Sequence, residues 1–306
     1  MRKLCICFIA FVIFACDTPK QIDENAYLEK LKTVQNQEDM PISEEVLTDI
    51  IQQIPSPLEI SVLLKEKGKN YEKSLLNKPE NYTNYNSNFE KAINLGIYGT
   101  DLGYSNIYEK NQDAIFYLNS IKGLAEGLSI GQFFDFGTIK RLATNSSNLD
   151  SLLLITTKNF NGINNYLQDQ RRSGISILIL TGGWLEALHI TCQVVQKNPD
   201  SMALKERIGE QKIILENIML LLSLYQHDPP ILKLVEEMKE LQKIFSEIEI
   251  VYTYKKSTLE EVNGILMIKD NSTSKINFTD QNLKDITRVT EEIRNRIINP
   301  QSAIKI

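Results

Sequence analysis

The sequence predicts an all-α fold, built as a multi-helix bundle or a layered array of helices. Apolar residues recur at helical spacing through most of the chain, and the breaks between the periodic stretches are short. The composition, 42% hydrophobic and 24% charged, is typical of a globular protein. Because no Pro/Gly/Ser-rich linker divides residues 41–306, we expect a single helical domain there.

The N-terminus has the pattern of a secretory signal peptide. A basic pair, Arg2-Lys3, precedes an apolar run from Leu4 to Ala15, which is shorter than the roughly 20 residues needed to span a bilayer. The run ends in Ile13-Phe14-Ala15-Cys16, which resembles a bacterial lipobox. We therefore expect residues 1–15 to be removed and Cys16 to be lipidated. The alternative is a plain signal peptide with an incidental cysteine.

Lipidation would make Cys16 the membrane anchor, since several acyl chains together hold a protein stably in a bilayer. Residues 16–40 then form the lipid-anchored N-terminus and its tether. This pattern predicts a protein of the cell envelope, at the outer membrane. Whether the body faces the periplasm or the cell surface is left open by the sequence.

The helices follow one another along the body. Weak periodicity predicts helices over residues 25–37, 43–54 and 56–68, and a short one over 71–76. Stronger periodicity predicts helices over 87–108, 112–127, 138–143, 148–170, 174–197, 201–225, 231–250 and 280–298. Between the last two, the apolar stretches 264–269 and 275–278 favour a small β-hairpin over 264–278.

The helix over 87–108 is expected to be the packing centre. Gly96, Gly99 and Gly103 fall at positions i, i+3 and i+7, so we expect them to share one face. Each costs a helix roughly 1 kcal/mol relative to alanine, a cost that a close backbone contact would explain. The glycine pair Gly182-Gly183 marks the partner helix. We predict that these two helices touch and that Asp101 is hydrogen-bonded nearby.

Charge and residue counts exclude several classes of function. With a net charge of -5 and no Lys/Arg cluster, the chain is a poor nucleic-acid binder, so no nucleic-acid partner is expected. Cys192 is the only cysteine in the body, which rules out an internal disulfide there and indicates a small buried apolar residue. With two histidines in the chain, we expect no metal site and no cofactor.

Two motifs suggest chemistry but have simpler explanations. Residues Gly127 to Gly131 match the G-x-S-x-G nucleophile elbow of hydrolases, which needs a preceding strand, whereas the preceding segment here is helical. A helix end followed by a turn explains the motif better. Glu186 and His189 match half of a di-iron site, but the chain has no second Glu-x-x-His pair. No catalytic residues are therefore assigned.

A candidate ligand groove lies between the two glycine-bearing helices. Its residues are the polar and aromatic side chains of both helices: Tyr98, Asp101, Tyr104, Trp184, Glu186 and His189. The alternative is core packing, in which Asp101 and Glu186 accept hydrogen bonds from neighbouring groups without any ligand.

Three segments, together with the lipobox, resemble a family of uncharacterised all-helical lipoproteins of the Bacteroidetes. The segments are Pro55–Ile60, Asn94–Leu102 and Thr181–Glu186. The resemblance implies an envelope location and an all-α fold, but it implies no activity. We expect a non-enzymatic lipoprotein of the cell envelope, a helical binding or scaffolding module whose partner, an envelope protein or a small ligand, the sequence does not identify. The alternatives are a binder of a small or lipid-like ligand in the groove and an enzyme of unrecognised type.

Overall fold

A computed structural model describes residues 46, 49–51, 54, 64, 70–143, 149–262, 265–269 and 271–300. All of them belong to one compact unit, Glu44–Ile306. The predicted signal peptide, Cys16, the tether and the helix over 25–37 lie outside the described residues, as do most of residues 43–68.

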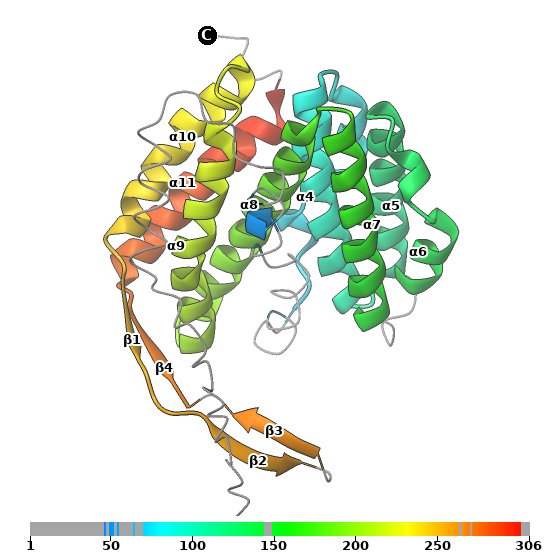
Figure 1. Cartoon of the computed structure of the whole chain (residues 1–306). Helices are drawn as coiled ribbons and strands as arrows, with labels where there is room; N and C mark the ends of the chain where they lie inside the picture. The colour runs from blue at the N-terminus through cyan, green and yellow to red at the C-terminus, as the bar shows by residue number, and fades with distance from the viewer. Residues whose placement is uncertain are drawn as a thin grey trace, which may run out of the picture. The chain divides into compact units, whose positions relative to one another are not determined.

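The structure confirms the all-α fold (Figure 1). The helices are α4 (Asn88–Ile107), α5 (Asn111–Gly127), α6 (Phe136–Ala143), α7 (Leu149–Asp169), α8 (Ser173–Lys197), α9 (Met202–Ser223), α10 (Pro229–Ser246) and α11 (Asp280–Ile298). Short 3₁₀ helices are η1 (Lys73–Leu75), η2 (Pro79–Asn84) and η3 (Gly131–Phe133). Helix α8 is central: α4 and α7 pack on it, as do α9 and α11, while α5 covers α4 and α10 covers α9 and α11.

Capping boxes explain where α4 and α11 begin. The backbone N–H of Glu90 donates to Ser87 Oγ at 3.1 Å, and the Ser87 N–H donates back to the Glu90 carboxylate at 3.0 Å. Thr279 and Asn282 make the same reciprocal pair before α11. Each box satisfies donors that a helix N-terminus otherwise leaves unpaired.

Helices α4 and α8 touch at their backbones, as predicted. A Cβ added to Gly96 would overlap the carbonyl oxygen of Ile179, and one added to Gly182 would overlap that of Ile93. Thr100 Oγ1 donates to the Gly183 carbonyl at 3.0 Å across the same contact. The absence of side chains at these positions therefore lets the two helices approach to backbone contact.

The prediction that Gly99 shares this face is wrong. A Cβ on Gly99 would have no neighbour within 4 Å. Three residues along an α-helix turn the chain by about 300°, so position i+3 lies about 60° away from position i. That rotation carries Gly99 off the line of contact with α8.

Helix α8 is buried along most of its length. Among the described residues it is the one helix long and apolar enough to cross a membrane, and 89% of its most apolar stretch lies inside the protein. Cys192 on this helix is fully buried, and burial raises the pKa of its thiol to about 12. Cys192 is thus a buried apolar residue, as expected.

The strands differ from the predicted hairpin. Strand β1 (Glu249–Thr253) pairs with β4 (Thr273–Asn277), and β2 (Thr258–Val262) pairs with β3 (Ile265–Lys269), both antiparallel. The predicted strands over 264–278 exist, but each pairs with an earlier strand instead of with the other. The helix predicted to reach Ile250 ends at Ser246, because the β-branched and aromatic run that follows, Ile250-Val251-Tyr252-Thr253, favours a strand.

Alanine at the two contact glycines should destabilise the protein, whereas alanine at Gly99 should not. Gly96→Ala and Gly182→Ala force two backbones apart, at a cost of about 1–3 kcal/mol. Gly99→Ala meets open space and gains about 1 kcal/mol of helix propensity. Urea unfolding monitored by circular dichroism measures all three. Changes of the same sign at Gly96 and Gly99 would contradict the contact.

Candidate functional site

A buried ion pair joins α8, one of the two glycine-bearing helices, to the last helix. Arg294 on α11 donates to Glu186 on α8 through both Nε, at 2.8 Å, and Nη2, at 2.7 Å. Both side chains are buried. This is the two-pronged geometry in which a guanidinium binds a carboxylate most strongly.

Sequence reasoning missed Arg294. Arg294 lies four residues after Thr290 and seven after Thr287, and both threonines are also buried on α11. The signal was therefore an arginine on the apolar face of a helix, combined with a glutamate in the apolar run of α8. Two oppositely charged residues on the buried faces of two helices are expected to form an ion pair, because a buried charge needs a partner.

The ion pair extends to the segment that precedes α4. Arg294 Nη2 also donates to the Leu75 carbonyl at 2.9 Å, and the Asn77 N–H donates to Asp101 Oδ2 at 3.2 Å. His189 lies against the same Leu75 carbonyl and close to Glu186. Asp101, Glu186 and His189, which we expected to lie near one another, are thus brought together around Arg294.

The pKa shifts in this cluster differ between its two carboxyl groups, Asp101 and Glu186. Burial and the nearby Glu186 carboxylate raise the pKa of Asp101 well above the usual 3.8. Burial would also raise the pKa of Glu186, but the Arg294 guanidinium outweighs it and lowers this pKa below the usual 4.5. Burial lowers the pKa of His189. These shifts favour the charged forms of Glu186 and Arg294 and the neutral forms of Asp101 and His189.

The other three predicted groove residues point to different neighbours. Tyr98 OH donates to the Lys78 carbonyl at 2.8 Å, and Tyr104 stacks on Tyr71 with ring centroids 5.5 Å apart. Trp184 Nε1 donates to Gln211 Oε1 on α9 at 3.0 Å. All six predicted residues are buried.

The six residues contact several different neighbours, and the ligand groove that they would share stays a prediction. The aromatic side chains of α4 pack into the protein, as expected for the core alternative, and Trp184 lies toward α9. A small-ligand site bounded by all six would need these side chains to converge on one space. Tyr98 and Trp184 have protein partners, whereas Asp101 Oδ1, Tyr104 OH and His189 Nδ1 are buried with no hydrogen-bond partner among the described residues.

The G-x-S-x-G motif has no nucleophile geometry. It follows α5 directly, where the elbow of a hydrolase follows a strand. Ser129 is exposed, adopts a φ of 60°, and its N–H donates to the Glu126 carbonyl at 3.0 Å. The motif is the end of a helix followed by a turn. Among the described residues, no group of three or more His, Cys, Asp or Glu is placed to hold a metal ion.

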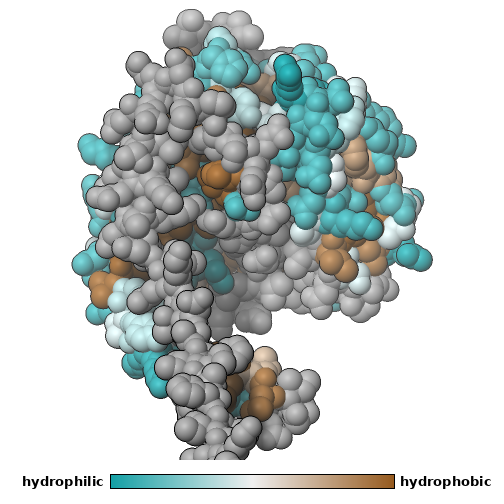
Figure 2. Space-filling model, in the orientation of Figure 1, coloured by the Kyte–Doolittle hydropathy of each residue, from teal (hydrophilic) through white to brown (hydrophobic). Residues whose placement is uncertain are grey.

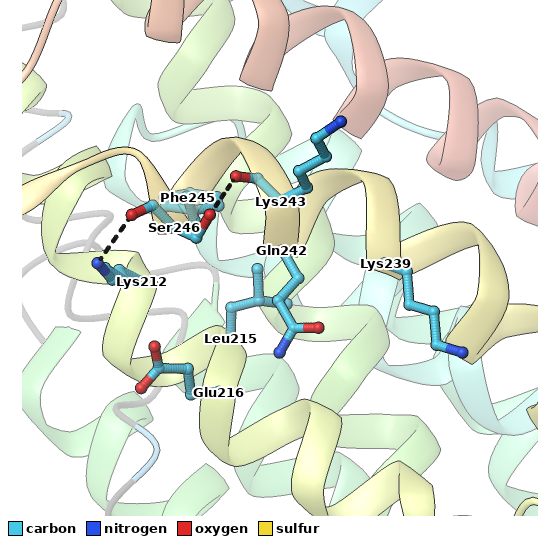
Figure 3. Close-up of a pocket in the computed structure, with 8 residues that line it drawn as sticks. All are labelled: Lys212, Leu215, Glu216, Lys239, Gln242, Lys243, Phe245 and Ser246. Carbon is cyan, nitrogen blue, oxygen red and sulfur yellow. Dashed lines mark hydrogen bonds between the residues drawn. The ribbon is translucent and has the colours of Figure 1, made fainter.

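An open pocket lies between α9 and α10 (Figure 3). Its volume is about 310 Å³, and its polar lining includes Lys212, Glu216, Lys239 and Lys243. Lys212 Nζ donates to the Ile248 carbonyl at 2.7 Å, next to the C-terminus of α10. In Figure 3 the amines of Lys239 and Lys243 point away from Lys212, so the lysines do not converge on one ligand. We interpret Lys212 as a cap that ties α9 to the end of α10.

Comparisons with protein families, with curated proteins and with solved structures find no match to this chain.

Replacing a carboxyl group by an amide should have a small effect on stability at Asp101 and a large one at Glu186. Asp101→Asn replaces a neutral carboxyl by a neutral amide and should change the free energy of unfolding by less than about 1 kcal/mol. Glu186→Gln turns an amide donor toward the Arg294 donors and removes a buried counter-charge, at a cost of about 3–5 kcal/mol. Urea unfolding at pH 7 compares them. The reverse order would mean that Asp101 carries the charge.

The pH dependence of the same pair is an independent check. Since the pKa of Asp101 is higher in the folded than in the unfolded protein, its stabilising proton is fully effective below about pH 3.8, and the benefit declines as pH rises toward the folded pKa. The Asp101→Asn variant lacks this decline. Its stability relative to the unmodified protein should therefore increase with pH from about pH 4 upward. A constant difference would contradict the protonated state.

Proposed function

We propose that this chain is a non-enzymatic interaction module of the cell envelope, anchored through lipid on Cys16. In this proposal the helices are a rigid support, and the hairpin of β2 and β3 is the surface that binds a partner protein. The lipobox and the resemblance to all-helical lipoproteins of the Bacteroidetes support the location. The exposed side chains of the hairpin support the binding role.

The observation that carries the proposal is the apolar surface of the β2–β3 hairpin. Leu259 and Leu266 are each 69% exposed, Met267 is 54% exposed and Ile268 is 78% exposed. Leu259 and Ile268 are direct cross-strand partners. In Figure 2 brown side chains gather at the lower end of the view, where Figure 1 places this hairpin. Leu259, Leu266 and Ile268 lie on one face of the hairpin and Met267 on the other. Exposed apolar patches mark interaction sites in soluble domains.

The strands that carry the hairpin are fixed to the helices. The Ile276 side chain on β4 lies against Gly209 of α9, where a Cβ would be only 2.5 Å from Ile276 Cγ2. Farther along, Asn271 Nδ2 donates to the Lys256 carbonyl at 2.9 Å and to Thr258 Oγ1 at 3.1 Å. These contacts present the hairpin on a positioned stem, which favours recognition over random exposure.

The charges of β2 favour a protein partner over a membrane. Glu260 is paired with Met267, and Glu261 with Leu266. Inserting Leu266 and Met267 into lipid would carry both carboxylates with them, at a cost of several kcal/mol. A protein surface can instead leave these carboxylates at a solvated rim while it covers the apolar side chains.

A photoreactive amino acid at Leu266 should crosslink to a protein in intact cells that produce the full chain. The control is Leu154 on α7, which is 72% exposed and lies on a helix. We expect a discrete protein adduct from position 266 and none from position 154. Denaturing gels and mass spectrometry detect both. Equal adducts at the two positions, or none at either, would remove the hairpin as the binding surface.

The lipid anchor has a separate test. Cys16→Ala removes the only acceptor that the lipobox provides, so the protein should stop incorporating labelled fatty acid and should move to the soluble fraction. Cys192→Ala is the control, because this buried thiol is not available for acylation. Fatty-acid labelling that persists in the Cys16→Ala protein would refute the anchor.

A further inference from the structure

We propose that the partner at the hairpin is a second copy of this chain, bound through the edge of β3 that pairs with no other described strand. The two hairpins then form one four-stranded antiparallel sheet with the two β3 strands at its centre. This inference rests on the proposed function, since it names the partner of the same surface.

The hydrogen-bond pattern of the hairpin determines which groups β3 offers. Val262 and Ile265 are the innermost pair, separated by two residues, and such a pair is hydrogen-bonded across the turn. Hydrogen-bonded and non-hydrogen-bonded pairs then alternate along the strands. Residues 265, 267 and 269 therefore bond to β2, while the N–H and C=O groups of Leu266 and Ile268 point outward.

Those outward groups match a symmetric register centred on Met267. When two β3 strands pair antiparallel in this register, Leu266 lies opposite Ile268 of the second copy, and Ile268 lies opposite its Leu266. Each of these pairs can exchange two hydrogen bonds, so the full set of outward groups is used. Met267 lies opposite its own counterpart in the intervening pair. A self-complementary edge of this kind is what a two-fold dimer requires.

The distribution of charge selects β3 over β2 as the paired edge. Strand β2 contains Glu260 and Glu261, and pairing two β2 strands would bring four carboxylates together. Like charges that face each other across strands are destabilising. Strand β3 is apolar from Ile265 to Ile268 and carries its one charge, Lys269, at its end. Pairing through β3 places the glutamates on the two outermost strands.

Strand number also favours association. A two-stranded hairpin is marginally stable by itself, and sheets of three or more strands are stable. Natural edge strands usually carry a central lysine, a proline or a bulge that blocks further pairing, and residues 265–268 contain no lysine or proline. The dimer converts two marginal hairpins into one four-stranded sheet and covers the unprotected edge of each.

A cysteine at Met267 in the full chain tests both the partner and the register. Opposed residues in a non-hydrogen-bonded pair have Cα atoms about 4.5 Å apart, within the range for a disulfide. We expect Met267→Cys to give a disulfide-linked dimer under mild oxidation on a non-reducing gel. Leu259→Cys, at a position that is also exposed but lies on the outer strand, should not, since the two copies would lie about 14 Å apart. The unmodified chain, with Cys5, Cys7, Cys16 and Cys192, gives the background.

A second pair of variants fixes the register and checks the fold. Co-production of Leu266→Cys and Ile268→Cys chains should give a mixed disulfide more readily than either gives alone. Met267→Lys should abolish the dimer, measured by light scattering of the full chain in detergent, while the helical circular dichroism signal stays unchanged. A Met267→Lys protein that remains dimeric would overturn the proposal.

The outcomes separate this inference from the proposed function. No Met267→Cys dimer above background, combined with a Leu266 crosslink to a different protein, would overturn the second copy and keep the hairpin as a binding surface. A Leu266 crosslink to lipid alone, or to nothing, would overturn both. Equal dimers from Met267→Cys and Leu259→Cys would overturn the register and with it the proposed edge.

Discussion

The backbone contact between α4 and α8 is the constraint on which the rest of the structure depends. It exists because Gly96 and Gly182 leave no side chain between the helices, and Thr100 adds a hydrogen bond to Gly183. Only at this separation do Asp101 of α4 and Glu186 of α8 share one buried space. Helix α11 then brings Arg294 into that space. The close contact at the two glycines therefore determines where the ion pair of Glu186 and Arg294 forms.

The buried guanidinium of Arg294 is balanced by the Glu186 carboxylate and by a backbone carbonyl. The bidentate pair with Glu186 leaves no net charge, and burial beside Glu186 raises the pKa of Asp101. The Leu75 carbonyl and the Asn77 N–H join the cluster and tie the chain before α4 to the core. Asp101 Oδ1 and His189 Nδ1 have no hydrogen-bond partner among the described residues. Buried polar clusters of this kind can order helices in a unique arrangement.

The helical core and the β2–β3 hairpin differ in the burial of their side chains. In the core, Tyr98 and Trp184 have protein partners for their polar ends. On the hairpin, leucine, methionine and isoleucine side chains face solvent on a stem that Ile276 fixes to α9. Apolar side chains are buried throughout the helical core but exposed on the hairpin, and this contrast locates the proposed binding surface.

Among the described residues, the sequence by itself determined most helix positions and the buried state of Cys192, because periodicity and helix caps act within one segment. Its glycines also marked the two helices that touch, because a helix interior without side chains favours a close backbone contact. Only the tertiary structure decided that Gly99 lies off the contact and that Arg294 completes the Asp101–Glu186 cluster. It also decided that β3 and β4 pair with earlier strands. These outcomes depend on contacts between residues far apart in the chain, such as Glu186 with Arg294, and no local pattern records which of several distant partners a side chain will meet.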